Sequence, residues 1–325
     1  MRLINVTVTD VAEQKNLLHQ WYTNPEIEAF RHPRHFLANK EPSGERMDFH
    51  YHFYQALFHY DQEHYERALD CLNQAGRTVF EMELEETGEW YFMLAAVYQR
   101  LYGYALSMKY CEKAMHIFSC KQNFRRMASC ENLFGINNQD IGQHNDAENH
   151  YRAAIRLCSH ADCTFMYMTV FHNIGVLHSK KDDPITALFY LKKANRLLSP
   201  EDVTNRTKNL YLLACNHFII GNTQEASRCF HEGLKVAAAG SNETYVHRFE
   251  ALRAKYLRPD AFETTYKKAI AYFLHRQRWE FVIEYGEELG LYYGKRKRFK
   301  EAYDYCDLAI IAKNKLEKER ELAHD

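Results

Sequence analysis

The sequence has almost no net charge and no long apolar run. Its 42 basic and 43 acidic residues leave a formal net charge of −1 over 325 residues, so no overall field favours nucleic acid or an acidic membrane. No apolar stretch approaches the roughly 18 residues of a membrane-spanning helix, and the opening segment MRLINVTVTD has no secretory hydrophobic region. These absences predict a cytoplasmic protein that does not act at a membrane.

Cysteine pairs and catalytic motifs are also missing. The nine cysteines include no CxxC pair, and their odd number argues against a disulfide framework, so we interpret them as small buried hydrophobic residues in a reducing compartment. There is no GxGxxG, P-loop, nucleophile elbow or HExxH motif. The sequence therefore predicts no catalytic residue, no cofactor and no bound metal.

What the chain does contain is a repeat. A small residue recurs at intervals of 39 or 40 residues, and its last copy follows after two further units of 38. These positions are Ala68, Ser107, Ala147, Ala187, Ala226 and Ala302. A period in this range indicates stacked helical hairpins, because a single hairpin cannot bury its apolar face without a neighbour. We therefore expect one all-α solenoid.

Two further small residues accompany each repeat position. Twelve residues upstream stand Ala56, Ala95, Gly135, Gly175, Ala214 and Gly290. Seven residues downstream stand Ala75, Ala114, Ala154, Ala194, Gly233 and Ala309. Small residues at these positions let the two helices of a hairpin approach closely, which is the tetratricopeptide pattern. A HEAT-like repeat would fit the long period but does not explain the triplet, so we predict a right-handed tetratricopeptide solenoid of about seven helix pairs.

The repeat also predicts where the hairpins lie. We expect pairs at 48–78, 88–119, 127–158, 166–198 and 207–238, a less regular pair at 243–275, and a last pair at 278–317 that ends in a charged helix. Residues 1–47 differ, with a strand-like LINVTVT, an amphipathic 11–22 and then three prolines. We interpret 1–47 as a short cap and 48–325 as the repeat domain.

Residues on the first helix of repeats three and four, most of them polar, are the candidate binding site. They are Asn132, Ile136, Gln139 and Asp140, followed by His172, Asn173, Val176, Ser179 and Lys180. An Asn amide offers a donor and an acceptor to one peptide unit, and Asp140 suits an amino terminus or a basic side chain. Alternatively, Asn173 and Asp140 only bond neighbouring helices. Their shared inner face favours a ligand.

Two other clusters suggest different ligands. Histidines gather around the first hairpin at His32, His35, His50, His52, His59 and His64. Zinc needs three or four ligands, and no carboxylate or thiol completes an i, i+4 pattern there. A basic run covers Lys295, Arg296, Lys297, Arg298 and Lys300. Because it lies at the turn between the last two helices, we interpret it as a solvated loop and expect no nucleic-acid binding.

Several segments together resemble one family. They are FYQALFHYDQEHYERALDCLNQA (53–75), YALSMKYCEKAMHIF (104–118), LFGINNQDIGQHNDA (133–147) and FHNIGVLHSKKDDPITALFYLKKA (171–194). These look like the Rap proteins of bacilli, which with their NprR and PlcR relatives bind short secreted signalling peptides that re-enter the cytoplasm. The resemblance covers about residues 48–317. It implies a groove that holds a penta- to heptapeptide.

The resemblance also implies roles for individual residues. Asn173 in NIG matches the family's asparagine for the peptide backbone, and Asp140 in QD matches its groove aspartate. Neighbouring positions vary in such families because they read peptide identity, and here they include Gln139, His172, Tyr211 and Cys215. The candidate peptide-binding set is thus Asn132, Gln139, Asp140, His172, Asn173, Val176, Lys180, Tyr211 and Cys215.

The amino-terminal region departs from the family. Rap proteins carry a three-helix bundle there that docks on response regulators and supplies a glutamine for hydrolysis of an aspartyl phosphate. Here 17–30 is similar to the first bundle helix, but two helices are missing before the repeats, and Gln14 and Gln20 stand in no convincing context. The helix-turn-helix that NprR and PlcR use on DNA is absent too. We therefore expect a reduced effector region.

These features predict a cytoplasmic regulator that binds a signalling peptide and controls a response regulator or transcription factor by protein contact, without catalysis. One alternative is an active aspartate phosphatase for a response regulator. Another is a tetratricopeptide scaffold that binds a protein tail and no free peptide. The sequence names neither the peptide nor the target.

Overall fold

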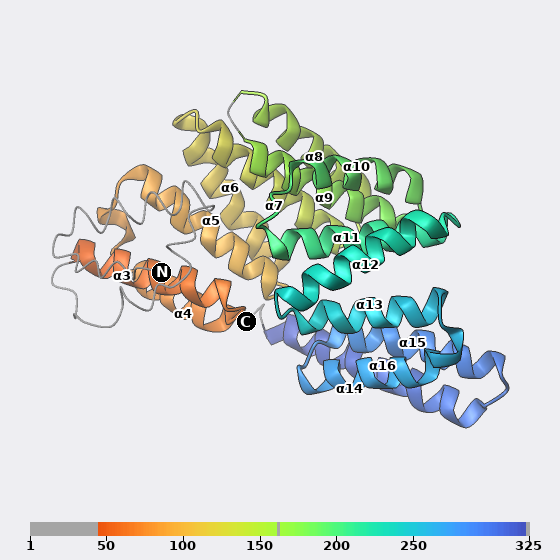
Figure 1. Cartoon of the computed structure of the whole chain (residues 1–325). Helices are drawn as coiled ribbons and strands as arrows, with labels where there is room; N and C mark the ends of the chain where they lie inside the picture. The colour runs from red at the N-terminus through yellow and green to blue at the C-terminus, as the bar shows by residue number, and fades with distance from the viewer. Residues whose placement is uncertain (1–44, 161–162, 323–325) are drawn as a thin grey trace, which may run out of the picture.

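The computed structural model describes residues 45–160 and 163–322, and every regular element in these ranges is a helix (Figure 1). Fourteen α-helices there form seven consecutive pairs, which confirms the predicted fold class. The pairs are α3 (Glu45–Asp61) with α4 (Tyr65–Ala75), α5 (Leu84–Arg100) with α6 (Tyr104–Cys120), α7 (Phe124–Asp140) with α8 (His144–Cys158), α9 (Thr164–Lys180) with α10 (Pro184–Leu197), α11 (Val203–Ile219) with α12 (Thr223–Ala239), α13 (Glu243–Tyr256) with α14 (Phe262–His275), and α15 (Trp279–Lys295) with α16 (Phe299–Leu322).

Two short 3₁₀ helices lie in the connections: Val79–Glu81 between the first and second pairs, and Pro259–Ala261 between the two helices of the sixth pair. The second accounts for the irregular sixth pair, because Pro259 cannot continue α13 and begins a separate turn. The predicted cap at 1–47 and its two glutamines lie outside the described residues, apart from the first turn of α3. None of the helices in the described ranges is long and apolar enough to cross a membrane.

The turns that join the helices follow a repeated backbone pattern. Within six of the pairs the chain passes through a left-handed residue before the second helix begins, at Glu63, Tyr102, Gly142, Asp182, Gly221 and Lys297. The connections between pairs have the same feature at Gln122, Ser241 and Gln277. Asparagine or aspartate side chains then accept a backbone N–H at the start of α7, α10, α11, α12 and α13. Such caps satisfy N–H groups that the helix cannot pair itself, so each helix begins at a defined residue.

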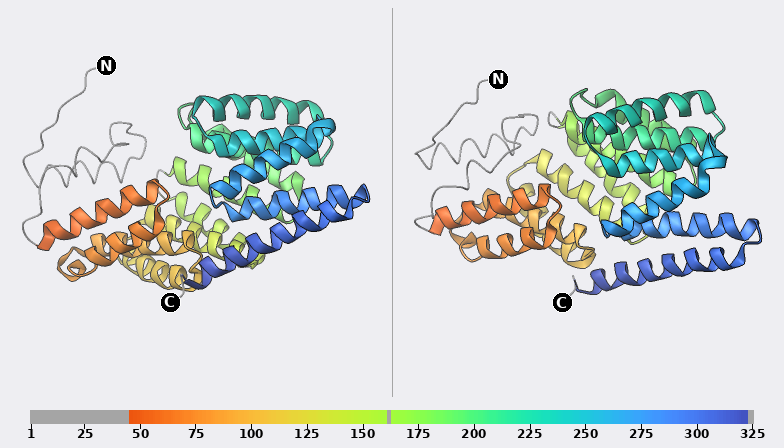
Figure 2. Two further views of the ribbon diagram at one scale, coloured as in Figure 1. Left: turned by 90° about the horizontal axis from the view of Figure 1, so that it is seen from below. Right: turned by 60° about the horizontal axis from the view of Figure 1, so that its bottom comes forward.

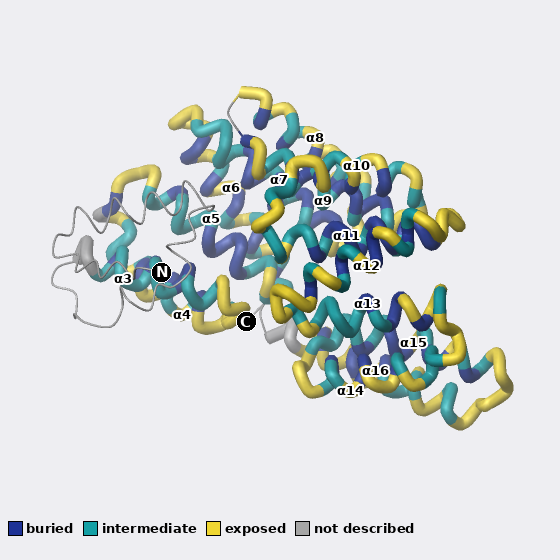
Figure 3. The backbone as a smooth tube through the Cα atoms, in the orientation of Figure 1, coloured by how far each residue is buried: buried dark blue, intermediate teal, exposed yellow. Residues whose placement is uncertain are grey.

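Small residues bring the two helices of a pair into close contact, as the repeat predicts. A Cβ on Gly135 would lie 2.4 Å from the Tyr151 ring, and one on Gly175 would lie 2.6 Å from Leu191 Cγ. In the second pair Ser107 Oγ donates a hydrogen bond of 2.7 Å to the backbone oxygen of Ala95. Buried residues recur along the successive pairs, between intermediate and exposed ones (Figure 3).

The first helices of the pairs line the inside of the stack. From α3 to α11 each first helix contacts both its own partner and the first helix of the next pair. The whole stack curls, so that the last pairs return towards the first (Figures 1 and 2). Arg278 Nη1 lies 3.5 Å from Glu63 Oε2, which joins the start of α15 to the turn after α3. The first helices thus lie on the inner side of a curled stack.

Candidate functional site

Each of four successive first helices places one side chain at the same position of the inner face. This position precedes the small buried residue of the helix by three residues, and the small residues are Gly135, Gly175, Ala214 and Ala251. From α7 to α13 the inner side chains are Asn132, His172, Tyr211 and Arg248. Sequence analysis identified the first three. The structure adds Arg248 on α13, whose repeat has no recognisable triplet.

The two asparagines of the candidate site bond directly to each other. Asn173 Nδ2 donates to Asn132 Oδ1 over 2.8 Å, which links α9 to α7. Asn132 is 8 % exposed, while Asn173 is half-buried. Each amide keeps further donor or acceptor capacity, because an amide offers two N–H groups and two lone pairs. The pair is therefore a fixed polar position that a peptide backbone can still reach.

Asp140 joins three consecutive first helices. Its Oδ2 accepts a hydrogen bond of 3.0 Å from Gln99 Nε2 on α5, and its Oδ1 lies 3.5 Å from Lys180 Nζ on α9. The Asp140 side chain is 25 % exposed, so the carboxylate is partly hydrated. Gln139 has turned inward instead, and its Oε1 accepts from Tyr151 Oη at 3.3 Å. The structure thus brings Asp140 and Lys180 together but gives Gln139 a packing contact between α7 and α8.

His172 is held in its neutral form. Burial lowers its pKa, although the hydrogen bond that it donates to Asn209 opposes that shift. Asn209 Nδ2 donates to Leu191 O and to Asn195 Oδ1, so its Oδ1 accepts from His172 Nδ1 over 3.1 Å. This network assigns the proton to Nδ1 and leaves Nε2 as a hydrogen-bond acceptor.

The remaining predicted residues give the groove its apolar part. Tyr211 is 6 % exposed, whereas Val176 and Cys215 are half-buried. Burial raises the pKa of the Cys215 thiol to about 12, so this cysteine stays protonated and acts as a small apolar contact. The nine cysteines are unpaired in the described ranges, but Cys120 and Cys306 are exposed, so the interpretation of all nine as buried hydrophobic residues is wrong for these two.

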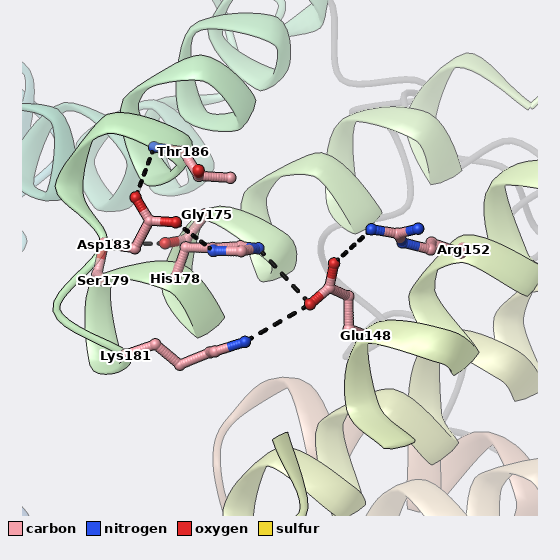
Figure 4. Close-up of polar contacts among 8 residues, drawn as sticks. All are labelled: Glu148, Arg152, Gly175, His178, Ser179, Lys181, Asp183 and Thr186. Carbon is pink, nitrogen blue, oxygen red and sulfur yellow. Dashed lines mark hydrogen bonds and ion pairs between the residues drawn. The ribbon is translucent and has the colours of Figure 1, made fainter. Parts of the chain in front are cut away.

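A polar network fixes the carboxyl end of α9, next to Lys180 (Figure 4). His178 Nδ1 lies 3.1 Å from Asp183 Oδ2, and its Nε2 lies 3.9 Å from Glu148 Oε2 on α8. Glu148 also pairs with Arg152 and Lys181. Burial alone would raise the Glu148 pKa, but these cations outweigh it and the net shift is downward. The network therefore ties α8, α9 and the start of α10 into one unit.

The other clusters of the sequence do not form a site. The described histidines of the first hairpin bring no group of three or more metal-ligating side chains together, and no such group occurs elsewhere in the described ranges. His32 and His35 lie outside these ranges. In the basic run, Arg298 pairs with Glu263 and Glu301, and Arg296 stacks on Tyr292. The run is thus partly neutralised at the α15–α16 turn.

Fold and inner face together define a tetratricopeptide-type solenoid with a polar concave groove. No sequence-family profile matches the chain. It is 26 % identical over 274 residues to the transcriptional activator NprA of Geobacillus stearothermophilus, covering 81 % of this chain and 68 % of that protein. It is 25 % identical over 248 residues to response regulator aspartate phosphatase E of Bacillus subtilis strain 168, covering 73 % and 65 %. The chain thus spans about two thirds of the length of these relatives.

Solved structures give the same answer for the fold. A Rap protein complexed with competence and sporulation factor has a TM-score of 0.76 at 18 % identity, covering 86 % of this chain and 78 % of its own. The Rap conjugation gene regulator of plasmid pLS20, in complex with the Phr* peptide, has a TM-score of 0.73 at 19 % identity, covering 88 % and 82 %. The chain is therefore a relative of the Rap-type regulators, which confirms the resemblance found in its sequence.

Proposed function

We propose that this protein is a peptide-responsive regulator. It binds a short linear peptide in the groove formed by α5 to α13 and controls a response regulator or transcription factor by direct contact. Two structural relatives are described as ligand complexes, and one sequence relative is named as a transcriptional activator. A cytoplasmic location is part of the same proposal, and the free cysteines support it.

The observation that carries this proposal is the fixed polar row on the inner face. Asn173 and Asn132 lie in a bonded pair, and Asp140 is held between Gln99 and Lys180. Groups that are already positioned lose little conformational entropy when a ligand binds. Amides read a peptide backbone regardless of its side chains, while the carboxylate selects a cationic group. An extended peptide is the ligand that uses both.

The test is a thermal shift with synthetic peptides of five to seven residues, including any short secreted peptide encoded beside the gene. A peptide at 100 times its dissociation constant should stabilise the protein by about 2.7 kcal/mol, because it binds only the folded state. Scrambled peptides of the same composition serve as the control. An unchanged melting temperature with every candidate, supported by calorimetric titration without heat, would contradict the proposal.

An active phosphatase is the second candidate function, because one relative is named as a response regulator aspartate phosphatase. We expect hydrolysis to be weak or absent, since it requires a rigidly placed group that orients water. Phosphate release from a phosphorylated receiver domain separates the two functions. Release that stops in Gln14→Ala or Gln20→Ala variants would favour the phosphatase.

A further inference from the structure

Arg248 occupies an unusual position at the end of the polar row. Its guanidinium carbon lies 4.1 Å from the ring centre of Tyr211 on α11, 5.1 Å from that of Tyr245, and 4.7 Å from that of Phe281 on α15. Rings from three consecutive first helices therefore surround one cation. The side chain is half-buried, and its Nε is fully buried without a hydrogen-bond partner.

The charge of Arg248 has no carboxylate partner in the described structure. The acidic residues on the facing side of α15 are Glu280, Glu284 and Glu288. Glu280 pairs with Arg278 at 2.8 Å, and Glu288 pairs with Lys255 at 2.8 Å. Glu284 forms no ion pair, and burial raises its pKa although Arg248 opposes that shift. The guanidinium cannot lose its proton, so Arg248 keeps its positive charge, with Glu284 as a nearby carboxyl group that forms no ion pair with it.

A buried charge without a counter-charge is costly, and proteins normally pair it or neutralise it. Packing alone does not require arginine here, because an apolar side chain would fill an aromatic cage without that cost. The rings lie within cation–π distance of the guanidinium carbon, and the in-plane N–H groups of a guanidinium are the ones that bind a carboxylate. A planar, immobilised fork of this kind fits a carboxylate in two-point contact.

We propose that Arg248 is the specificity residue that binds a carboxylate of the peptide in the groove. This inference rests on the proposed function and names the class of peptide: one whose terminal carboxylate, or whose Asp or Glu side chain, reaches α13. Arg248 stands in the same inner row as Asn132, His172 and Tyr211. A peptide lying along that row meets amides on α7 and α9 and a cation on α13.

The experiment uses pools of randomised heptapeptides and the immobilised full chain. One pool carries free carboxyl termini and the other carries carboxyl-terminal amides, and bound peptides are sequenced by mass spectrometry. Individual binders are then titrated against wild type and Arg248→Gln, beside versions in which Asp and Glu are replaced by Asn and Gln. We expect Arg248→Gln to weaken carboxylate-bearing binders by about tenfold or more. The neutral version of each binder should bind both proteins equally.

The two pools identify the source of the carboxylate, since loss on amidation indicates the terminus and loss on Asp or Glu replacement indicates a side chain. Arg253→Gln is the matched control, because Arg253 lies on the same helix, exposed and paired with Glu250. Arg248→Lys keeps the positive charge but removes the two-point donor, so it should also weaken binding. This variant replaces Arg248→Gln in the titrations if Arg248→Gln does not fold. Peptides that bind wild type and both Arg248 variants equally overturn this inference alone. Enrichment of no peptide from either pool overturns the proposed function as well.

Discussion

At the scale of single residues, the polar groups of the groove on α7 and α9 already have partners, unlike Arg248 Nε on α13. Asn173 bonds to Asn132, Asp140 contacts Gln99 and Lys180, and His172 donates to Asn209. A ligand must therefore add to these hydrogen bonds or exchange with them. The advantage of this arrangement is preorganisation, because side chains held by their neighbours present the same arrangement of donors and acceptors to every peptide. The disadvantage is that each new hydrogen bond contributes less to the binding free energy than one made by a group without a partner.

Two substitutions test this pattern. Asn173→Ala should weaken peptide binding by roughly 0.5–1.5 kcal/mol for each hydrogen bond lost, and Asp140→Asn by about 1.5–3 kcal/mol if the carboxylate meets a cation. Calorimetric titration measures both, and circular dichroism melts report the fold. Asp146→Asn on the outer helix α8 is the control. A variant that binds within twofold of wild type, or that melts many degrees lower without peptide, identifies that residue as structural.

Histidine charge should make stability depend on pH. His217 is 2 % exposed, and both its ring nitrogens are buried without hydrogen-bond partners. Burial lowers its pKa, and the charge of Lys192 adds to that effect. The unfolded chain therefore takes up a proton below about pH 6.5 while the folded chain resists it, so stability is present above that pH and is lost below it.

We expect the urea concentration at the unfolding midpoint to decrease when the pH is lowered from 7.5 to 5.5, and to decrease less in His217→Leu. The slope does not vanish in that variant, because burial also lowers the pKa of His59, His172 and His247. Measuring both proteins at both pH values isolates the contribution of His217. Equal slopes would show that this imidazole does not control the pH dependence.

The residue types of the site could be predicted from the sequence, but their pairing could not. Asn132, Asp140, Asn173 and Lys180 stand out because polar side chains recur on one helix face. The rotation between neighbouring helix pairs decides which of these side chains form hydrogen bonds. The repeat period does not determine that rotation. Gln139 shows the limit: its neighbour Asp140 turns into the groove, whereas Gln139 bonds to Tyr151 within its own pair.

At the scale of helix pairs, the repeated small residues set the distance between helices. Gly135 faces the Tyr151 ring so closely that a methyl group has no space, whereas Gly294 near the end of α15 has nothing within 4 Å of its missing Cβ. The sequence pattern predicted the first kind of contact correctly. The pattern did not identify Arg248. The sixth pair lacks the three small residues, so the sequence did not indicate which residues of α13 face inward.

A matched pair of glycine substitutions tests this account. Gly135→Ala should destabilise the protein by about 1–3 kcal/mol, because the added methyl overpacks a rigid contact. Gly294→Ala should leave stability unchanged or raise it by up to about 1 kcal/mol through helix propensity. Urea unfolding measures both. A Gly135→Ala variant as stable as Gly294→Ala would mean that the pairs tolerate a wider separation than the repeat implies.

At the scale of the whole molecule, stability is distributed over successive pairs. Each pair packs mainly on its neighbours, so a repeat protein behaves approximately as a row of coupled units. The period of 39–40 residues was sufficient to predict that row. It did not predict that Arg278 would meet Glu63, since a contact between residues so distant in the chain depends on the sum of all intervening rotations.

Because Glu63 and Arg278 lie near opposite ends of the stack, the distance between their side chains reports how tightly the stack curls. Each pair of neighbouring helices from α4 to α15 contributes a packing angle. Small changes in these angles add up, so together they change the distance between the two side chains. An exposed ion pair of this kind contributes little to stability, and it opens or closes without unfolding anything. Under the proposed function, a peptide that changes the angle between two neighbouring pairs therefore changes the distance between Glu63 and Arg278.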